Sequence, residues 1–297
     1  MRREMLERVI RAMRPLTLRG KGFVFDYVTP HDGVRRATVA GSYSMNLHLA
    51  NVVHRQIFMG CFASAMTRWT KVLLDEGGTF VDVGAHAGYF SLIAADRVGR
   101  VGRVFAVEPN PVVFSALQAH LTANGISHVE ACNWGLAERD GSTELYVPRP
   151  ESLRDYNATM LPRPDWAAIE IRLRRLDACL DEWDARRIDL MKIDVEGAEP
   201  RVLAGGAAHL ASGVVRHMMI EINGPRLVEA RSSPAALVDE LAALGFEPAR
   251  VVHGRAIRVD RTNLDLDPTH EWDRLFVHRA ATNEEERGRV VLTGGSS

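Results

Sequence analysis

From residue 79 onward, short apolar runs alternate with longer segments that have the periodicity of an amphipathic helix. The apolar runs are nearly uninterrupted, as expected of strands that are buried on both faces of a sheet. This alternation predicts an α/β fold with a mostly parallel sheet covered by helices on both sides. The expected strands are residues 79–83, 103–108, 128–132, 188–194 and 216–222, and the expected helices are residues 88–98, 111–124, 198–211 and 234–244.

Other segments flank or interrupt this pattern. Residues 135–175 form an insertion with a turn signal and a proline-rich run, which predicts a β-hairpin or loop. The end of the sheet is expected to carry an antiparallel last strand. We predict an N-terminal helical and β extension at residues 1–75, a cofactor-binding domain at 76–280 and a disordered tail at 281–297. Within these parts we expect helices at residues 1–13 and 58–74, a strand pair at 23–28 and 36–39, and late strands at 250–259 and 274–278.

The composition is that of an ordinary globular protein, and we expect its substrate to be a small molecule. The formal net charge is −1, so the basic surface typical of nucleic-acid-binding proteins is not expected. Three widely spaced cysteines favour a reducing compartment over a disulfide scaffold or a four-cysteine zinc site. Neither a signal peptide nor a membrane helix is predicted. We therefore expect a cytoplasmic protein without a nucleic-acid or membrane partner.

A glycine-rich turn follows the first predicted strand of the sheet. It reads Asp82-Val83-Gly84-Ala85-His86-Ala87-Gly88, and Gly84 and Gly88 permit a tight turn and a close approach of the backbone to a ligand. In open α/β sheets, the first such turn binds the cofactor. Glu108 ends the second strand, at a spacing where a carboxylate can hold the hydroxyls of a ribose. This pattern predicts a nucleotide-like cofactor.

The residue types in the turn separate two cofactor classes. A dinucleotide places a pyrophosphate on this turn and usually requires glycines where His86 and Tyr89 stand. Asp82 at the strand end would also repel a diphosphate. A ligand with an amino group and no phosphate would favour Asp82 instead. The turn therefore favours S-adenosylmethionine over a dinucleotide.

Charged residues end the fourth and fifth strands. Lys192, Asp194 and Glu196 would share one side if the fourth strand stayed extended, and Glu221 and Asn223 share a side of the fifth. Such residues are costly to bury without a partner or a task. We predict Asp194, Glu196 and Lys192 as the catalytic residues, although Lys192 could equally serve only to neutralise a carboxylate.

Four motifs together resemble the FkbM family of class I S-adenosylmethionine-dependent methyltransferases. They are FVDVGAHAGYFSL at 80–92, AVEPNP at 106–111, LMKIDVEGAEPRVLAGG at 190–206 and MMIEIN at 218–223, of which IDVEGAE is the most specific. The resemblance implies a Rossmann-like methyltransferase sheet and, mostly, O-methylation of sugars, polyketides and other specialised metabolites. It implies contacts from Asp82, Gly84 and Gly88 to the cofactor, from Glu108 to its ribose and from Asn133 and Trp134 to its adenine. We add His86 and Asn110, from the same loops, to the predicted cofactor-binding set.

Two mechanisms for activating the acceptor remain open. In the first, Glu196 or a histidine acts as base without a metal. In the second, Asp194 or Glu196 joins Glu221 and Asn223 in an oxygen-rich magnesium site, which is similar to that of catechol-type O-methyltransferases. The Glu-x-Asn pair here matches that pattern imperfectly, so we prefer the metal-free mechanism.

The leading hypothesis is O-methylation of a small molecule. N-methylation, methylation of a peptide, and a non-catalytic nucleotide-binding protein are the alternatives. Arginines concentrate in the insertion, and they suggest an anionic acceptor. They are Arg149, Arg154, Arg163, Arg172, Arg174 and Arg175.

Overall fold

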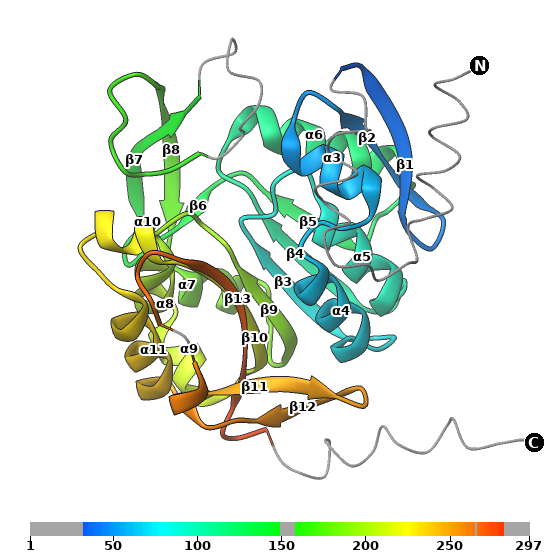
Figure 1. Cartoon of the computed structure of the whole chain (residues 1–297). Coiled ribbons are helices and arrows are strands. Elements are labelled where there is room, and N and C mark those ends of the chain that lie inside the picture. The colour runs from blue at the N-terminus through cyan, green and yellow to red at the C-terminus, as the bar shows by residue number, and fades with distance from the viewer. Residues whose placement is uncertain (1–31, 149–157, 265, 282–297) are drawn as a thin grey trace, which may run out of the picture.

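A computed structural model describes residues 32–148, 158–264 and 266–281 of the chain. Its main feature is an eight-stranded sheet in the order β12-β11-β13-β10-β9-β3-β4-β5 (Figure 1). The strands from β10 to β5 run parallel, whereas β13 is antiparallel to both of its neighbours. The predicted α/β fold, with its antiparallel last strand, is confirmed. The strands are β3 (Thr79–Val83), β4 (Arg103–Val107), β5 (Val129–Cys132), β9 (Ile188–Ile193), β10 (Val215–Asn223), β11 (Phe246–Val252), β12 (Arg255–Arg258) and β13 (Glu271–His278).

The direction in which the chain builds this sheet reverses at β3. From β3 the chain adds β4 and β5 toward one edge, and it later adds β9 and β10 on the other side of β3. Ligands of open α/β sheets bind at such a reversal, outside the carboxyl ends of the strands. The strand order therefore places the loops after β3, β4 and β9 around one crevice.

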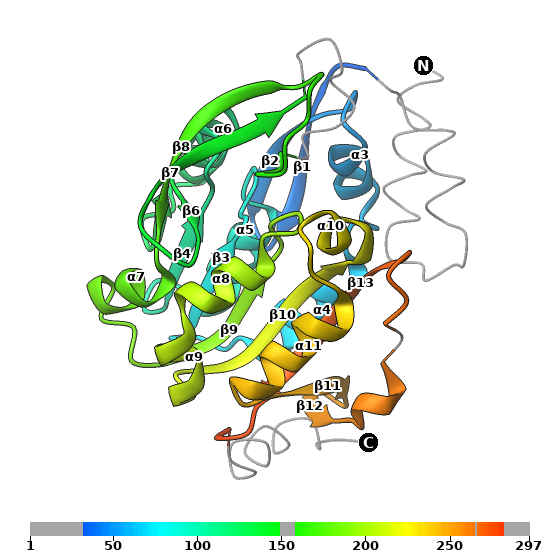
Figure 2. The same cartoon turned by 90° about the vertical axis from the view of Figure 1, so that its left-hand side faces the viewer.

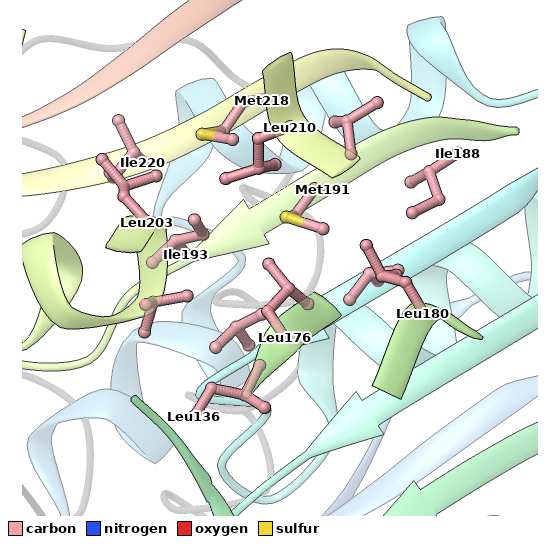
Figure 3. Close-up of a cluster of buried hydrophobic side chains, with 14 of the residues drawn as sticks. Leu136, Leu176, Leu180, Ile188, Met191, Ile193, Leu203, Leu210, Met218 and Ile220 are labelled. Carbon is pink, nitrogen blue, oxygen red and sulfur yellow. The ribbon is translucent and has the colours of Figure 1, made fainter. Parts of the chain in front are cut away.

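Helices cover both faces of the sheet, because alternate side chains of each buried strand point to opposite faces. One face packs on α7, α8, α9 and α11 through residues such as Val81, Met191 and Ile220 (Figure 3). The predicted helix at 198–211 is interrupted at Gly206, where a Cβ would lie 2.6 Å from Leu176 Cδ2 of α7. The helices of this face are α7 (Leu176–Glu182), α8 (Glu199–Gly205), α9 (Ala207–Ser212) and α11 (Pro234–Ala243).

The opposite face packs on α4 and α5, and an adjoining core joins α6 to the N-terminal elements. The predicted helix at 58–74 is wrong in its bounds, because Gly60 ends α3 in a left-handed conformation with φ 69°. Residues 36–39 do form a strand, but their partner is residues 43–48, whereas the predicted partner 23–28 lies outside the described residues. These elements are β1 (Val34–Ala40), β2 (Tyr43–His48), α3 (Val52–Met59), α4 (Ser64–Leu73), α5 (Tyr89–Val98) and α6 (Pro111–Ala123).

The insertion forms a separate three-stranded sheet in the order β6-β8-β7, which confirms the expected hairpin. In Figures 1 and 2 this sheet and the β1–β2 hairpin with α3 stand on opposite sides of the upper region of the molecule. The predicted strand 250–259 is instead a hairpin, since His253 and Gly254 both have positive φ and turn the chain. The remaining elements are β6 (Gly135–Leu136), β7 (Gly141–Val147), β8 (Ala167–Arg174), α10 (Gly224–Glu229) and the 3₁₀ turn η2 (Arg261–Asn263).

None of the helices within the described ranges is long and apolar enough to cross a membrane. Cys61, Cys132 and Cys179 are all free thiols. The predicted helix at 1–13 lies outside the described residues, and so does almost all of the predicted tail.

Candidate functional site

A cavity of about 300 Å³ lies at the carboxyl ends of the central strands, where the strand order reverses. Its walls come from seven parts of the chain that are far apart in sequence. They are α3 with Phe62, the loop after β3, the loop after β4, the three-stranded sheet of the insertion, and the ends of β9, β10 and β13. The predicted site residues that line it are Gly84, His86, Glu108, Lys192, Asp194, Glu196 and Glu221.

The two glycines of the β3 turn have different functions. Gly84 has φ 77°, and a Cβ there would lie 1.9 Å from the carbonyl oxygen of Asp194. Only glycine lets the loop after β3 touch the loop after β9 at this point. Gly88 precedes α5 with φ 92°, and its Cβ would lie 2.5 Å from Leu117 Cδ1. Gly88 therefore allows α5 to pack closely on α6 and does not line the cavity.

Glu108 is held in the cavity wall by two backbone amides. The His86 N–H donates to Oε2 and the Asn110 N–H donates to Oε1, both at 2.9 Å. The residue is only 7% exposed, and this burial raises the pKa of its carboxyl to about 7. Asn110 also caps α6 through Val112 N–H. Asn110 thus positions Glu108 rather than lining the cavity itself.

His86 combines a left-handed backbone with a half-buried ring in the cavity wall. Its φ is 50°, which turns its N–H toward Glu108. The ring lies edge-on to that of His54, with 6.0 Å between centroids. Burial, together with the nearby Lys192 ammonium, lowers the pKa of His86 to about 4. The imidazole is therefore neutral near pH 7 and able to accept a proton.

Asp82 and Lys192 are direct neighbours on β3 and β9 and point to the same face of the sheet. The Lys192 ammonium lies 3.6 Å from Asp82 Oδ1 and 3.2 Å from Asp194 Oδ2, and it donates to Gly84 O at 2.9 Å. Ser91 donates to Asp82 at 2.6 Å. Asp82 is fully buried and does not line the cavity. It thus reaches the site only through Lys192, and the cofactor contact that the family resemblance implies stays a prediction.

Lys192 remains charged in this environment. It is 2% exposed, and its burial disfavours the ammonium. The adjacent carboxylates of Asp194 and Asp82 outweigh burial and raise the pKa of Lys192. The Lys192 ammonium therefore links β3 to the loop after β9 by ion pairs with Asp82 and Asp194.

The IDVEGAE segment forms a tight loop after β9. The strand ends at Ile193, and Glu196 has φ 54°, so the extended geometry assumed for Glu196 does not occur. Its carboxylate instead lies 3.4 Å from the Nε of Arg226. Glu199 is fully buried and accepts hydrogen bonds from Val195 N–H and Gly197 N–H, at 3.1 and 3.3 Å. Glu199 thus holds the loop that carries Asp194 and Glu196.

The residues predicted to meet the adenine lie beside the cavity and do not line it. Asn133 donates to the carbonyls of Glu108 and Pro109, at 2.8 and 3.1 Å, and so braces the loop after β4. Trp134 packs against the core, with the Arg174 guanidinium 5.1 Å from its ring centre. The cavity wall next to Glu108 is apolar and comprises Pro109, Gly135, Leu136, Leu145 and Ile171.

Asn223 is already engaged by other residues. Its Nδ2 donates to Glu271 and its Oδ1 accepts from Arg226 N–H at the start of α10. A metal bound to Asp194, Glu221 and Asn223 would have to break this helix cap. In the part of the chain that the structure describes, no three His, Cys, Asp or Glu residues are arranged to hold a metal ion.

Residues 82–248 match the family described as the Methyltransferase FkbM domain. The chain belongs to the FkbM methyltransferase family. The family predicted from the IDVEGAE and VDVGAHAG motifs is thus confirmed, and the matched region includes the loops after β3, β4 and β9. The match of this FkbM-family chain begins in β3, at Asp82, and ends in β11.

Curated relatives of this FkbM-family chain come from bacteria and fungi. The 31-O-demethyl-FK506 methyltransferase FkbM of Streptomyces tacrolimicus is 31% identical over 198 residues, or 57% of this chain and 72% of that protein. Methyltransferase sdnD of Sordaria araneosa is 29% identical over 55% of this chain and 71% of that protein. The AMB antimetabolite synthetase AmbE of Pseudomonas aeruginosa is 31% identical over 68% of this chain, which spans only 11% of that protein.

Solved structures are more distant. An FkbM methyltransferase from Methylobacillus flagellatus has 17% identity and a TM-score of 0.44, with 76% of this chain and 54% of that chain covered. Aeropyrum pernix fibrillarin with bound S-adenosyl-L-methionine has 16% identity and a TM-score of 0.38, with 70% and 68% covered. Our assignment of the site therefore depends on the residues of this chain.

Sequence reasoning missed two groups of site residues. Glu199 is in the most specific motif, but a carboxylate that binds its own loop cannot be distinguished in sequence from one that faces a ligand. Val53, Gln56 and Ile57 of α3 and Leu145 and Ile171 of the insertion line the cavity, yet none has a local signal. Their amphipathic spacing would fit any packed helix or strand equally well.

Proposed function

We propose that this chain binds S-adenosylmethionine in the cavity and transfers its methyl group to a hydroxyl of a small molecule. The observation that carries the proposal is Glu108, a buried carboxylate held by two backbone amides beside an apolar wall. A ribose would find an acceptor for its hydroxyls there, and an adenine would find the adjacent apolar surface. FkbM-family membership supports the same reaction.

The residues around the β3 turn fit such a cofactor. At Gly84 the turn lies so close to the loop after β9 that no side chain would fit. The nearby cavity wall carries carboxylates rather than groups that would bind a phosphate. Asp82 acts indirectly, by holding the Lys192 ammonium. When bound, the cofactor supplies a methyl group on a positively charged sulfur. The protein has to orient an acceptor oxygen in line with that methyl.

Asp194 and Glu196 are our proposed catalytic residues. Both line the cavity, and both are held by cations, Asp194 by Lys192 and Glu196 by Arg226. They would accept a hydrogen bond from the acceptor hydroxyl and draw its proton away as the oxygen attacks. Neutral His86 is the second candidate base. We assign Lys192 a positioning role, since its ammonium is already shared by two carboxylates and the Gly84 carbonyl.

A small-molecule acceptor fits the enclosed shape and the charge of the site. Among the described residues, the cavity wall includes no arginine, and the chain has a net charge of −1. Helix α3 and Phe62 cover one side of the cavity. We propose that the N-terminal extension and the insertion together select the acceptor.

Calorimetric titration tests the cofactor assignment. We expect S-adenosylmethionine to bind and NAD not to bind, because no built phosphate site follows β3. Binding of NAD alone would overturn the proposal. Turnover on a panel of hydroxylated acceptors, measured with and without a chelator, tests the metal. Activity that persists after chelation would support the metal-free mechanism, whereas loss that magnesium restores would support the alternative.

A further inference from the structure

The end of the cavity away from Glu108 is strongly acidic. Asp194, Glu196, Glu221 and Glu271 line it, and Lys192 is the one cationic side chain found among the lining residues of the described chain. The charge of Lys192 is already shared by Asp82 and Asp194. Glu196 is balanced by Arg226. Among the described residues, Glu221 and Glu271 form no ion pair of their own, and Glu221 only shares the field of Lys192 with the two aspartates.

Glu221 is the least compensated of these carboxylates. It lies on β10 directly opposite Asp273 of β13, so both side chains are on the same face of the sheet (Figure 1 shows the two strands side by side). Like charges in this arrangement destabilise a sheet. Among the described residues Glu221 makes no hydrogen bond or ion pair, and burial together with Asp194 raises its pKa well above the ordinary value. A cation arriving in the cavity would favour the ionised carboxylate and offset this repulsion.

The arginines of the insertion do not balance this charge. Arg163 pairs with Glu229, Arg175 pairs with Asp177, and Arg172 and Arg174 lie over the Trp134 ring. None of these arginines lines the cavity, and Arg149 and Arg154 lie outside the described residues. The anionic acceptor that we expected from the basic composition of the insertion therefore finds no support in the described site.

We propose that the methyl acceptor is a small molecule that carries a protonated amine, and that Glu221 binds this amine. Glu271 at the rim of the cavity contributes to the same attraction. This inference rests on the proposed function, because it takes the loop after β3 and Glu108 as the cofactor side. A fixed carboxylate in a partly dry cavity attracts an ammonium more strongly than one on the surface does, so it discriminates by charge.

Matched ligands of different charge test this assignment in the full-length protein. The probes are tyramine, its neutral N-acetyl derivative and 4-hydroxyphenylacetate, together with the corresponding series built on 4-aminobutanol. Each is titrated into protein saturated with S-adenosylhomocysteine, and turnover with S-adenosylmethionine is followed by mass spectrometry. We expect the amines to bind at least about tenfold more tightly than their neutral and anionic counterparts.

Two isosteric variants separate a local effect from a general one. Glu221→Gln should reduce the preference for the amines to about parity, while the affinity for S-adenosylhomocysteine stays unchanged. Glu170→Gln removes an exposed carboxylate of β8 that does not line the cavity, and it should leave the preference intact.

Each adverse outcome has a distinct meaning. Equal binding of all three charge types, no binding of any amine up to about 10 mM, or a preference that survives Glu221→Gln overturns the inference. Binding of magnesium alone that is lost in Glu221→Gln would also overturn it, because the acidic end would then serve a metal. If the wild-type protein binds neither S-adenosylmethionine nor S-adenosylhomocysteine, the proposed function fails first.

Discussion

The two ends of the cavity differ in how their charges are balanced. On the cofactor side, Glu108 accepts two backbone N–H groups, and Lys192 joins Asp82 to Asp194. At the acidic end, which we propose binds the acceptor, Glu221 lies opposite Asp273 on the neighbouring strand and, among the described residues, forms no ion pair of its own. At the first end, the hydrogen bonds and ion pairs of these side chains are already formed before any ligand binds. This suits a ligand that is the same in every turnover. The second end retains uncompensated charge, which a particular acceptor can neutralise.

The largest effect should come from breaking the contact between the loops on the cofactor side. Gly84→Ala places a methyl group 1.9 Å from the Asp194 carbonyl in a left-handed backbone. We expect a loss of about 4–6 kcal/mol in the free energy of unfolding, together with loss of cofactor binding. Urea denaturation and calorimetry measure the two effects.

Gly125→Ala is the matched control for this substitution. Gly125 has φ 63°, but a Cβ there would meet nothing within 4 Å. It should cost only about 1–2 kcal/mol, from the left-handed backbone alone. Equal losses for the two variants would show that the loop contact is not what requires Gly84.

Removing the buried ammonium should have the next largest effect. Lys192→Met leaves Asp82 fully buried without its counter-ion, which should cost about 3–5 kcal/mol of unfolding free energy. Lys71→Met changes an exposed lysine near the end of α4 and should cost less than about 0.5 kcal/mol. If Lys192→Met were as mild as its control, the cofactor side would not depend on this charge network.

The pH dependence of stability should reveal the burial of Glu108. Its pKa in the folded protein is about 7, above the ordinary value of 4.5, so the folded state holds this proton more tightly than the unfolded chain does. The corresponding stability is complete below pH 4.5 and is lost as the pH rises through 7.

Comparison of the wild type with Glu108→Gln isolates the contribution of Glu108 to the pH dependence of stability, because His54, His86 and the other titrating groups are common to both proteins. As the pH rises from 4.5 to 7, the wild type should lose roughly 2–3 kcal/mol of unfolding free energy relative to the variant. Urea denaturation of both proteins across this range gives the difference. Parallel stability curves would mean that Glu108 titrates normally.

The smallest of these effects should be on cofactor affinity. Glu108→Gln keeps the shape of the side chain, but its amide nitrogen can no longer accept one of the two backbone N–H groups. We expect the dissociation constant for S-adenosylmethionine to rise about 10–100-fold, measured by calorimetry at pH 8. Glu170→Gln should not change it. An unchanged affinity in Glu108→Gln would remove Glu108 from the ribose site and leave the two ends of the cavity undistinguished.

Local patterns in the sequence determined the parallel part of the sheet. The runs that became β3, β4, β5, β9 and β10 are largely apolar, and each is bounded by a helical segment or a turn. Glycine positions were equally informative, because a residue without a Cβ is required wherever two backbones touch. Gly84 and Glu108, at the ends of adjacent strands, were therefore predictable as parts of one site.

Errors occurred where a contact distant in sequence determined the outcome. The helix at 198–211 divides at Gly206, which packs closely on Leu176. The strand at 250–259 is a different case, because it folds back at a local turn through His253 and Gly254. The contact between Asp82 and the cofactor stays a prediction, and the structure shows only that Asp82 is buried next to Lys192 and does not line the cavity. Such outcomes depend on the strand that lies alongside, which local periodicity does not specify.

The sequence by itself determined the family and predicted the end of the cavity that we propose for the cofactor, because both reside in short contiguous motifs around Gly84, Glu108 and Asp194. Only the tertiary structure decided the character of the acceptor side. It left the described arginines of the insertion outside the cavity lining and brought Glu221 opposite Asp273 through the antiparallel pairing of β10 and β13. The physical reason is that charge balance in a cavity depends on distances between side chains, and those distances exist only after the strands have paired.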